Sequence, residues 1–292
     1  MGHKSGFVNI LGNPNVGKST IMNALVGENL SIITSKAQTT RHRIMGIVNG
    51  DDFQIVYSDT PGIIKPNYKL HESMMKFVSS AITDADILLY VTDVEEDMLR
   101  NSEYLKRIGR LRIPVVLLIN KIDLSSHSRV EELMAKWEKV LPGAFIIPLS
   151  AKAGFNLDKV FGKIVGLLPE SPPYYPKDTL TDKTERFFAS EIIREKVFLN
   201  YQKEIPYSAE IEIEEFTREK DLLRIRAVIH VSRDTQKGII IGKKGAALKK
   251  TGTEARIDLE EFFGSRVYLE LFVKVTKDWR SKEQQLKRFG YR

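Results

Sequence analysis

The chain has 292 residues, 42% hydrophobic and 28% charged, a composition typical of a globular protein with about two domains. No segment reaches the roughly 18 uninterrupted apolar residues of a membrane span, and a strand-like run follows the start too closely to leave room for a secretory signal. The absence of cysteine excludes disulfides, thiol nucleophiles and thiolate metal sites. We therefore expect a cytoplasmic protein.

Positive charge is concentrated toward the end of the chain. The whole chain carries 45 Lys and Arg against 38 Asp and Glu, a net charge of +7, and residues 233–292 alone carry 15 against 8. A basic C-terminal region favours a polyanionic partner, although a solvated surface is the commoner explanation of such a moderate excess.

Short apolar runs alternate with amphipathic stretches through the first 170 residues. The predicted strands cover residues 7–11, 53–57, 87–92, 114–119 and 144–148, and the predicted helices cover 18–27, 70–84, 99–110, 128–140 and 156–168. Near-continuous hydrophobicity suits strands that are covered on both faces. The alternation predicts an α/β domain, with a mostly parallel sheet and helices on both faces.

The segment that follows interrupts this pattern. Four of the eleven prolines lie within residues 168–176, which favours an extended connection rather than a helix. Beyond it we expect a helix, two strands, a glycine-bearing helical segment and a last strand, over residues 183–200, 209–216, 222–231, 238–262 and 267–275. These elements predict a smaller α+β domain. We therefore divide the chain into a domain over 1–170, a linker over 171–182 and a domain over 183–292.

Residues 12–19, Gly-Asn-Pro-Asn-Val-Gly-Lys-Ser, match the phosphate-loop pattern G-x-x-x-x-G-K-[ST] between an expected strand and an expected helix. Glycines let backbone N–H groups close around phosphate oxygens, and the helix N-terminus adds the positive end of its dipole. Lys18 would reach the β- and γ-phosphates, and the Ser19 hydroxyl would ligate magnesium. A plain strand-to-helix turn is the alternative. The residues expected to contact nucleotide here are Gly12, Asn13, Asn15, Val16, Gly17, Lys18, Ser19 and Thr20.

Asn120-Lys121-Ile122-Asp123 follows an apolar run, at a point where loops of a parallel sheet meet ligands. The Asp123 carboxylate only accepts hydrogen bonds, so it matches the N1–H and the exocyclic amine of guanine and repels the unprotonated N1 of adenine. Asn120 can bridge loops or contact the base, and the stem of Lys121 can lie along the ring. The pattern, about a hundred residues after the phosphate loop, favours a guanine nucleotide.

Three weaker signals occur in a consistent order. In Asp59-Thr60-Pro61-Gly62, Asp59 would hold magnesium through water and the Gly62 amide could meet the γ-phosphate. Either Thr39 or Thr40 could supply a hydroxyl to magnesium, and Ser150-Ala151-Lys152 could present N–H groups to the guanine carbonyl. We predict a magnesium–GTP site with Ser19, Thr40 and Asp59 at the metal. The predicted catalytic contacts are Lys18, Thr40 and Gly62.

The basic region contains a second glycine motif, Gly242-Lys243-Lys244-Gly245. In a KH domain such a G-x-x-G loop joins two helices and clamps the backbone of about four nucleotides. A helix-capping turn is the alternative, because G-x-x-G is common. The apolar run before the loop and the regional charge favour RNA. The expected RNA-contacting residues are Ile241, Gly242, Lys243, Lys244, Gly245, Lys249 and Lys250.

Together these motifs resemble the Era family of bacterial GTPases, within the translation-factor-like branch of small GTPases. Residues 37–43, 59–62, 189–196 and 268–275 look like that family's sequence, and the resemblance covers nearly the whole chain. It implies a P-loop GTPase domain followed by a KH domain, hydrolysis of GTP to GDP with Mg²⁺, and a role in ribosome biogenesis. The implied partners are the 30S ribosomal subunit and its RNA near the 3′ end.

Two positions bear on how GTP would be hydrolysed. Ile63 stands where signalling GTPases carry a water-orienting glutamine, and the Era family shares this hydrophobic replacement. Asn15 matches the position at which some relatives hold potassium, so K⁺ is a candidate cofactor. We further expect a monomer, either free in the cytoplasm or peripheral at the inner face of the plasma membrane.

Two other functions compete with this one. A metabolic P-loop kinase is disfavoured by the guanine-reading pattern. An RNA-binding adaptor with a decayed nucleotide site is disfavoured by the intact Lys18, Ser19, Asp59 and Asp123.

Overall fold

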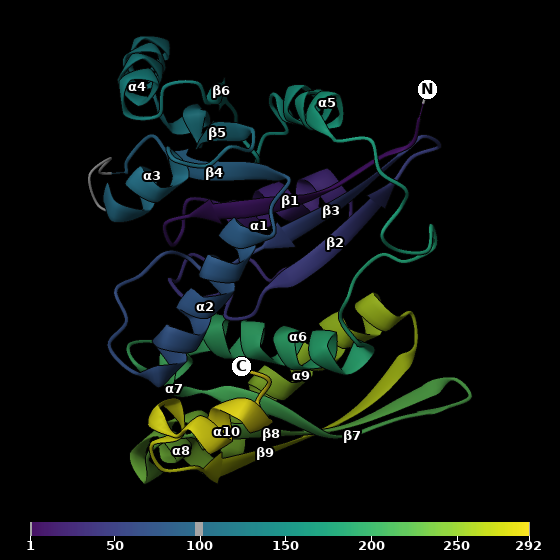
Figure 1. Cartoon of the computed structure of the whole chain (residues 1–292). Coiled ribbons are helices and arrows are strands. Elements are labelled where there is room, and N and C mark those ends of the chain that lie inside the picture. Colours follow the sequence, from purple (N-terminus) through teal and green to yellow (C-terminus); the bar gives the residue numbers. More distant parts are fainter. Residues whose placement is uncertain (1, 97–101, 292) are drawn as a thin grey trace. The chain divides into compact units, whose positions relative to one another are not determined.

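The computed structural model describes residues 2–96 and 102–291. The chain forms two compact units, of which the first contains Met1–Lys65 and Met74–Asp182 and the second contains Pro66–Ser73 and Lys183–Arg292 (Figure 1). Residues 99–101 of the expected helix 99–110 lie outside the described residues.

The first unit is built on a six-stranded sheet in the order β2-β3-β1-β4-β5-β6. All neighbouring strands are parallel except β2 and β3, which are antiparallel. The mostly parallel α/β sheet predicted from the sequence is confirmed. The strands are β1 (Lys4–Gly12), β2 (Ile44–Asn49), β3 (Phe53–Asp59), β4 (Ile87–Asp93), β5 (Val115–Asn120) and β6 (Phe145–Pro148).

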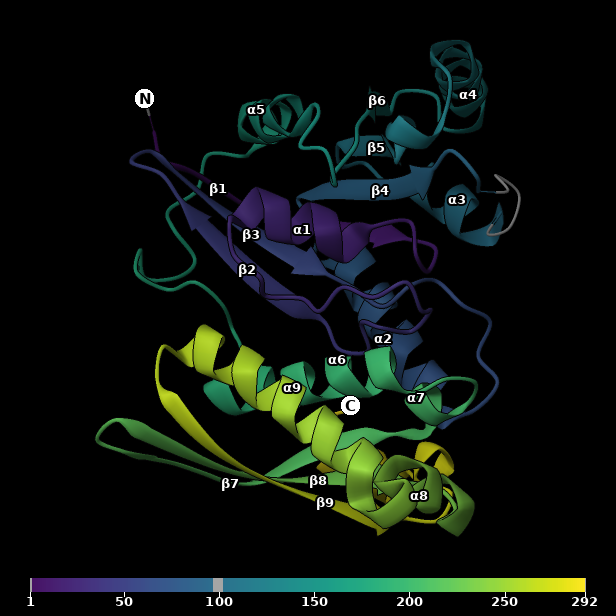
Figure 2. The same ribbon diagram turned by 180° about the vertical axis from the view of Figure 1, so that it is seen from behind.

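Helices cover both faces of this sheet. Figure 1 shows α2 and α3 in front of the strands, and Figure 2, from behind, shows α1 in front. Every residue of β4 is buried as a result. No helix formed by the described residues is long and apolar enough to cross a membrane. The helices are α1 (Lys18–Val26), α2 (Lys69–Thr83), α3 (Ser102–Ile108), the short 3₁₀ helix η1 (Ile122–Leu124), α4 (His127–Val140) and α5 (Leu157–Leu167).

Strand β2 was not predicted from the sequence. It has only six residues, and Gly46 interrupts its apolar pattern. The glycine is needed there, because a Cβ at Gly46 would lie 2.7 Å from Cγ2 of Val26 on α1. The strand starts four residues after Thr40, so it is the first regular structure after the stretch that carries the expected magnesium ligand.

Residues 171–182, expected to be a linker, belong to the first unit. The Ile47 N–H donates to the Leu180 carbonyl at 2.8 Å, and the Thr181 hydroxyl donates to the Met45 carbonyl at 2.6 Å. These bonds serve the outer edge of β2, whose backbone groups would otherwise lack partners on that side. The proline-rich segment forms no helix, contains a turn at residues 177–178, and is hydrogen-bonded to the sheet up to the start of the second unit.

The second unit has a three-stranded sheet in the order β7-β8-β9, with β7 antiparallel and β9 parallel to β8. Helices α6 and α9 pack against each other and against the two outer strands. The predicted smaller α+β domain is confirmed. Its elements are α6 (Glu185–Asn200), α7 (Ile205–Ser208), β7 (Glu210–Glu219), β8 (Leu222–Val231), α8 (Asp234–Ile241), the 3₁₀ turn η2 (Lys243–Gly245), α9 (Ala246–Phe263), β9 (Arg266–Val275), the 3₁₀ turn η3 (Trp279–Ser281) and α10 (Glu283–Arg288).

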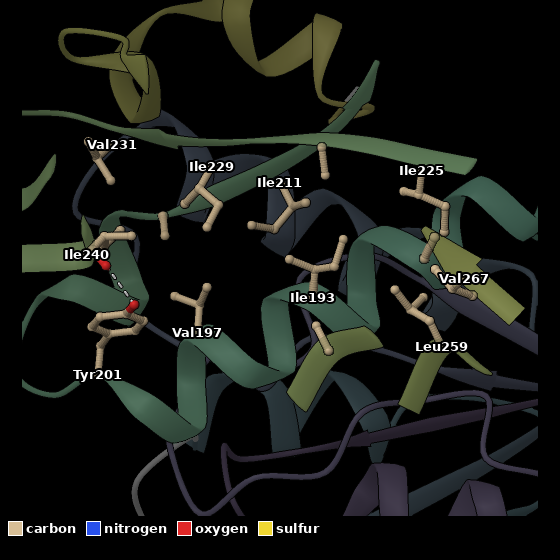
Figure 3. Close-up of a cluster of buried hydrophobic side chains, with 14 of the residues drawn as sticks. Ile193, Val197, Tyr201, Ile211, Ile225, Ile229, Val231, Ile240, Leu259 and Val267 are labelled. Atoms are coloured by element: carbon tan, nitrogen blue, oxygen red, sulfur yellow. Dashed lines mark hydrogen bonds between the residues drawn. The ribbon is translucent and has the colours of Figure 1, made fainter. Parts of the chain in front are cut away.

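Alternating apolar residues of β8 face the helices and form the core of this unit (Figure 3). At one end of the core the Tyr201 hydroxyl donates to the carbonyl of Ile240 at 2.8 Å and accepts from the Thr251 hydroxyl at 3.0 Å. Tyr201 therefore connects the end of α6 to the end of α8, two residues before Gly242. The bond to Ile240 fixes the position of the end of α8, which leads into the G-x-x-G loop.

We predict that Tyr201→Phe lowers the stability of the second unit by about 1–2 kcal/mol, because two buried polar groups lose a partner. Denaturant unfolding compared with the wild type measures the change. Tyr268→Phe is the control, since Tyr268 is about half exposed and its hydroxyl can bond to water. Equal stability of the Tyr201→Phe and Tyr268→Phe variants would contradict the prediction.

Candidate functional site

A cavity of about 740 Å³ opens at the carboxyl edge of the first sheet, a size suited to a small-molecule ligand. Thirteen expected nucleotide residues line it, namely Asn15, Gly17, Lys18, Ser19, Thr20, Thr40, Gly62, Asn120, Lys121, Asp123, Ser150, Ala151 and Lys152. Four others lie buried behind the wall, namely Gly12, Asn13, Val16 and Asp59. The structure thus brings together segments that are far apart in the sequence.

Asn120 joins three of these segments. Its Nδ2 donates to the Val16 carbonyl at 2.8 Å, and its Oδ1 accepts from the Ala151 N–H at 3.0 Å. Gly17, with φ at 95°, is needed beside it, because a Cβ there would lie 2.2 Å from the Asn120 amide. Of the two roles considered for Asn120, the structure shows the loop-bridging one.

The phosphate end of the cavity contains a buried ammonium group. Lys18 is 6% exposed, and its Nζ donates to the Asn13 carbonyl at 2.8 Å. Burial lowers the pKa of Lys18 to about 8, although the carboxylates of Asp59 and Glu96 oppose the shift. A phosphate bound at this point would favour the charged ammonium and compensate its desolvation.

Two hydroxyls converge on the Asp59 carboxylate. Ser19 Oγ donates to Asp59 Oδ2 at 2.6 Å, and Thr40 Oγ1 lies 2.9 Å from Ser19 Oγ and 3.2 Å from the same carboxylate oxygen. Thr39 instead donates its hydroxyl to the Lys36 carbonyl. Of the two candidate threonines, Thr40 is therefore the one whose hydroxyl reaches this point.

These oxygens fit a hard divalent cation. Asp59 is fully buried, and its Oδ1 has no hydrogen-bond partner in the described part of the chain. Burial raises the pKa of Asp59, against the opposing influence of Lys18 and of the neighbouring hydroxyls. A cation beside the carboxylate would favour its charged form, and hydroxyl and carboxylate oxygens are ligands that Mg²⁺ prefers.

The base end of the cavity is organised by two further contacts. Ser150 Oγ donates to Asp123 Oδ1 at 2.6 Å, which orients the carboxylate. Lys121 Nζ forms an ion pair with Asp93 at 2.6 Å. Asp93 was not predicted from the sequence, because its place opposite Asn120 at the end of β4 follows from the parallel strand register.

The stretch before Thr40 is held at its beginning by Asn23 of α1. The Asn23 side chain accepts from the N–H groups of Leu30 and Ser31 at 3.1 and 3.0 Å and donates to the Ser31 carbonyl at 2.7 Å. Residues further along this stretch that were not predicted also line the cavity, namely Ile32, Ile33, Thr34, Ser35 and Gln38. They match no short motif, so only the fold reveals them.

The G-x-x-G loop of the second unit connects α8 to α9. Gly242 has φ at 71°, and a Cβ there would lie 2.6 Å from the Cβ of Ala247, so glycine is required. The four lysines of this region are exposed, whereas Ile241 and both glycines are partly buried. The described lysines at Lys243, Lys244, Lys249 and Lys250 thus form an exposed cationic surface, although Lys250 lies 3.8 Å from Glu254.

A phosphate loop and a guanine-reading loop on a mostly parallel sheet, followed by helices joined through G-x-x-G on a three-stranded sheet, define a P-loop GTPase with a KH domain. The family model described as "50S ribosome-binding GTPase" matches residues 7–121, and the KH domain model matches residues 204–280. The fold class predicted from the sequence is therefore confirmed.

The similarity extends to whole proteins. The GTPase Era of Syntrophus aciditrophicus (strain SB) is 46% identical over 294 residues, covering 99% of this chain and 95% of the relative. The GTPase Era of Staphylococcus haemolyticus (strain JCSC1435) is 43% identical over 291 residues, covering 99% and 97%. The chain belongs to the Era GTPase family, and it is a GTPase, as predicted.

Solved structures agree over nearly the full length. Era in complex with MgGDPNP and nucleotides 1506–1542 of 16S ribosomal RNA matches with a TM-score of 0.95 and 40% identity, covering 99% of both chains. A single-residue variant of Aquifex aeolicus Era bound to GDP·AlF₄⁻ matches with a TM-score of 0.94, the same identity and the same coverage.

We predict that Asp123→Asn moves the base preference from guanine toward xanthine. Xanthine carries a carbonyl where guanine carries its amine, and the new amide can donate to it. Asp123 is exposed here, and a bound base would bury it; a polar group left unpaired in that contact costs about 1–3 kcal/mol, enough for roughly ten- to hundredfold discrimination. Competition between GDP and XDP measures the change. Unchanged guanine preference in a folded variant would remove Asp123 from base reading.

Proposed function

We propose that the protein is a magnesium-dependent GTP switch that binds small-subunit ribosomal RNA near its 3′ end and assists assembly of the 30S subunit. The observation that carries this proposal is the full-length match to a structure containing both MgGDPNP and a 16S ribosomal RNA segment. The geometry adds support, because one chain combines the hydroxyl–carboxylate cluster of the cavity with an exposed lysine loop.

In this proposal the first unit handles the nucleotide. Ser19, Thr40 and Asp59 hold Mg²⁺, which neutralises charge on the β- and γ-phosphates when bound. Lys18 adds a second positive charge, and the Gly62 N–H meets the γ-phosphate. Asp123 then selects guanine. In this proposal Thr40 reaches the metal site from a stretch outside the phosphate loop.

The second unit handles RNA, through the loop of Gly242–Gly245. At Gly245 the space where a Cβ would lie is open, so the backbone there is accessible to a sugar–phosphate chain, whereas Gly242 is required by its close contact with Ala247. The lysines inside the loop point to phosphate as the group that is bound, since a compact ammonium suits a point of negative charge.

We predict that Lys243→Asp combined with Lys244→Asp weakens binding of single-stranded RNA about tenfold or more and leaves GTP binding nearly unchanged. Two lost phosphate contacts should also reduce the slope of log affinity against log salt by about 1.4. Aspartate tolerates the positive φ of Lys244, so the loop can keep its shape. RNA gel shifts and fluorescent GDP titration on one preparation measure both effects.

The control is Lys277→Asp combined with Lys282→Asp, which changes the net charge equally at exposed positions outside the loop. It should reduce RNA affinity less and keep a steeper salt slope. Equal losses in the two double variants would show that general charge, rather than this loop, attracts RNA.

Potassium is a second part of the proposal. Asn15, with φ at 67°, contacts the Ser35 carbonyl through its side-chain amide at 3.1 Å, across the mouth of the cavity. If the Asn15 side-chain amide is flipped, so that its oxygen and nitrogen exchange places, its Oδ1 and the Ser35 carbonyl oxygen both face the space between them. Uncharged oxygens of this kind replace the hydration shell of K⁺. A monovalent cation there would stabilise negative charge in the transition state, and this would help hydrolysis in a chain whose Ile63 cannot orient water.

We predict that hydrolysis is about tenfold faster in KCl than in NaCl at equal concentration, which is roughly 1.4 kcal/mol of transition-state stabilisation. Asn15→Ala should abolish this difference, whereas Asn29→Ala, at an exposed position of the same unit, should retain it. Single-turnover phosphate release measures the rates. A potassium advantage that survives in Asn15→Ala would place the cation elsewhere.

The expected cytoplasmic location, monomeric state and peripheral attachment to the inner face of the plasma membrane stay predictions. Analytical sedimentation with and without anionic vesicles distinguishes a free monomer from a membrane-attached one.

A further inference from the structure

Arg43 lies at the centre of a buried polar network in the first unit. Its Nε donates to the Ser58 hydroxyl at 2.6 Å, and its two terminal nitrogens bind the Asp84 carboxylate at 2.6 and 3.0 Å. A further bond of 3.1 Å joins Nη2 to Asn9 Oδ1. Arg43 is 8% exposed, whereas Asp84 is about half exposed, so these charge-assisted bonds are buried at the guanidinium and reach water at the carboxylate.

The partners of Arg43 come from separate elements. Asn9 belongs to β1 and Ser58 to β3, and Asp84 directly follows α2. Asn9 completes the network by donating to the Asp84 carboxylate and to the Ala81 carbonyl, both at 2.7 Å. Four bonds from one guanidinium thus fasten the backbone at position 43 to two strands and to the end of a helix.

The network lies three residues after Thr40, and three Cα–Cα steps span at most about 11 Å. His42 adds a ring contact to Phe77 on α2, with the centroids 6.0 Å apart. The stretch that carries Thr40 is therefore held at its beginning by Asn23 and at its end by Arg43. The distance over which Thr40 can move is therefore limited by the short segment that connects it to Arg43.

We propose that Arg43 is a positioning residue for GTP hydrolysis, which holds Thr40 within reach of the magnesium site. This inference rests on the proposed role of Thr40 at the metal. The physical reason is pre-organisation. With position 43 fixed, the chain orders fewer backbone torsions each time Thr40 engages the cation, so less conformational entropy is lost.

The chemistry of arginine supports this reading over simple charge burial. A lysine would keep the positive charge, but it cannot bind the Asp84 carboxylate with two parallel N–H groups while also reaching Ser58 and Asn9. Arg43→Lys therefore tests the geometry of the anchor with little change in charge or volume.

The experiment compares wild type, Arg43→Lys and Thr40→Ala, each as the full chain, by GDP affinity, GDPNP affinity and single-turnover hydrolysis at varied Mg²⁺. GDP lacks the γ-phosphate, so its affinity should stay within about twofold of wild type in both variants. Residues that orient metal ligands typically contribute 10–100-fold, so Arg43→Lys should lose about tenfold in rate and require several-fold more Mg²⁺.

Arg194→Lys is the matched control, because Arg194 forms a buried two-bonded pair with Glu191 in the second unit. It should reduce stability without changing the magnesium requirement. If Arg43→Lys fails to fold, Asp84→Asn tests the same anchor from its half-exposed end and should show the same pattern.

The outcomes separate the two claims. If Thr40→Ala leaves the magnesium dependence of hydrolysis unchanged, the proposed role of Thr40 is wrong. If Thr40→Ala changes it and Arg43→Lys does not, the anchor is not a positioning device. Equal losses of GDP and GDPNP affinity in Arg43→Lys would also overturn the inference, since they indicate a general structural role.

Discussion

The nucleotide site depends on the parallel direction of its strands. Strands β1, β3, β5 and β6 all end at one edge of the sheet, so the four loops that follow them meet there. Asn120 then ties the phosphate loop to the loop after β6 through two hydrogen bonds. The same convergence places Lys18, Ser19 and Asp123, the residues proposed to meet phosphate, metal and base, around one cavity. Catalytic geometry is in this sense a consequence of sheet topology.

Convergence also creates an electrostatic problem that ligand binding resolves. Lys18 and Asp59 are both buried. Burial lowers the pKa of Lys18 and raises the pKa of Asp59, so both shifts favour the neutral form of the side chain. The two charges favour each other, but neither is fully compensated within the protein. In the proposed binding mode, a magnesium–triphosphate complex would bring an anion to the lysine and a cation to the carboxylate. Binding of the complete ligand would then lower the electrostatic free energy of the site.

Local motifs made much of this site predictable. The phosphate loop, Asp59–Gly62 and Asn120–Asp123 each combine a specific residue pattern with a preceding apolar run, and the sheet then brings them together. Residues that act through long-range partners were not visible. Asp93 pairs with Lys121 across neighbouring strands, and Arg43 reaches partners up to 41 positions away. No short sequence pattern predicts such a pair, because only the register of the folded strands brings the two residues together.

The edge strand β2 is a second feature that the sequence pattern did not predict. The hydrogen bonds from residues 180–181 to β2 depend on a strand that the sequence pattern did not reveal. Strand β2 begins one residue after Arg43, and its Met45 N–H donates to the Asp182 carboxylate. A continuous series of bonds therefore leads from the stretch that carries Thr40 to the last residue of the first unit. Any displacement of β2 must stretch those bonds or move residues 180–182 with it. Residues 180–182 are thus bonded to the edge strand of the GTPase sheet, whereas a freely flexible linker would make no such bonds to β2.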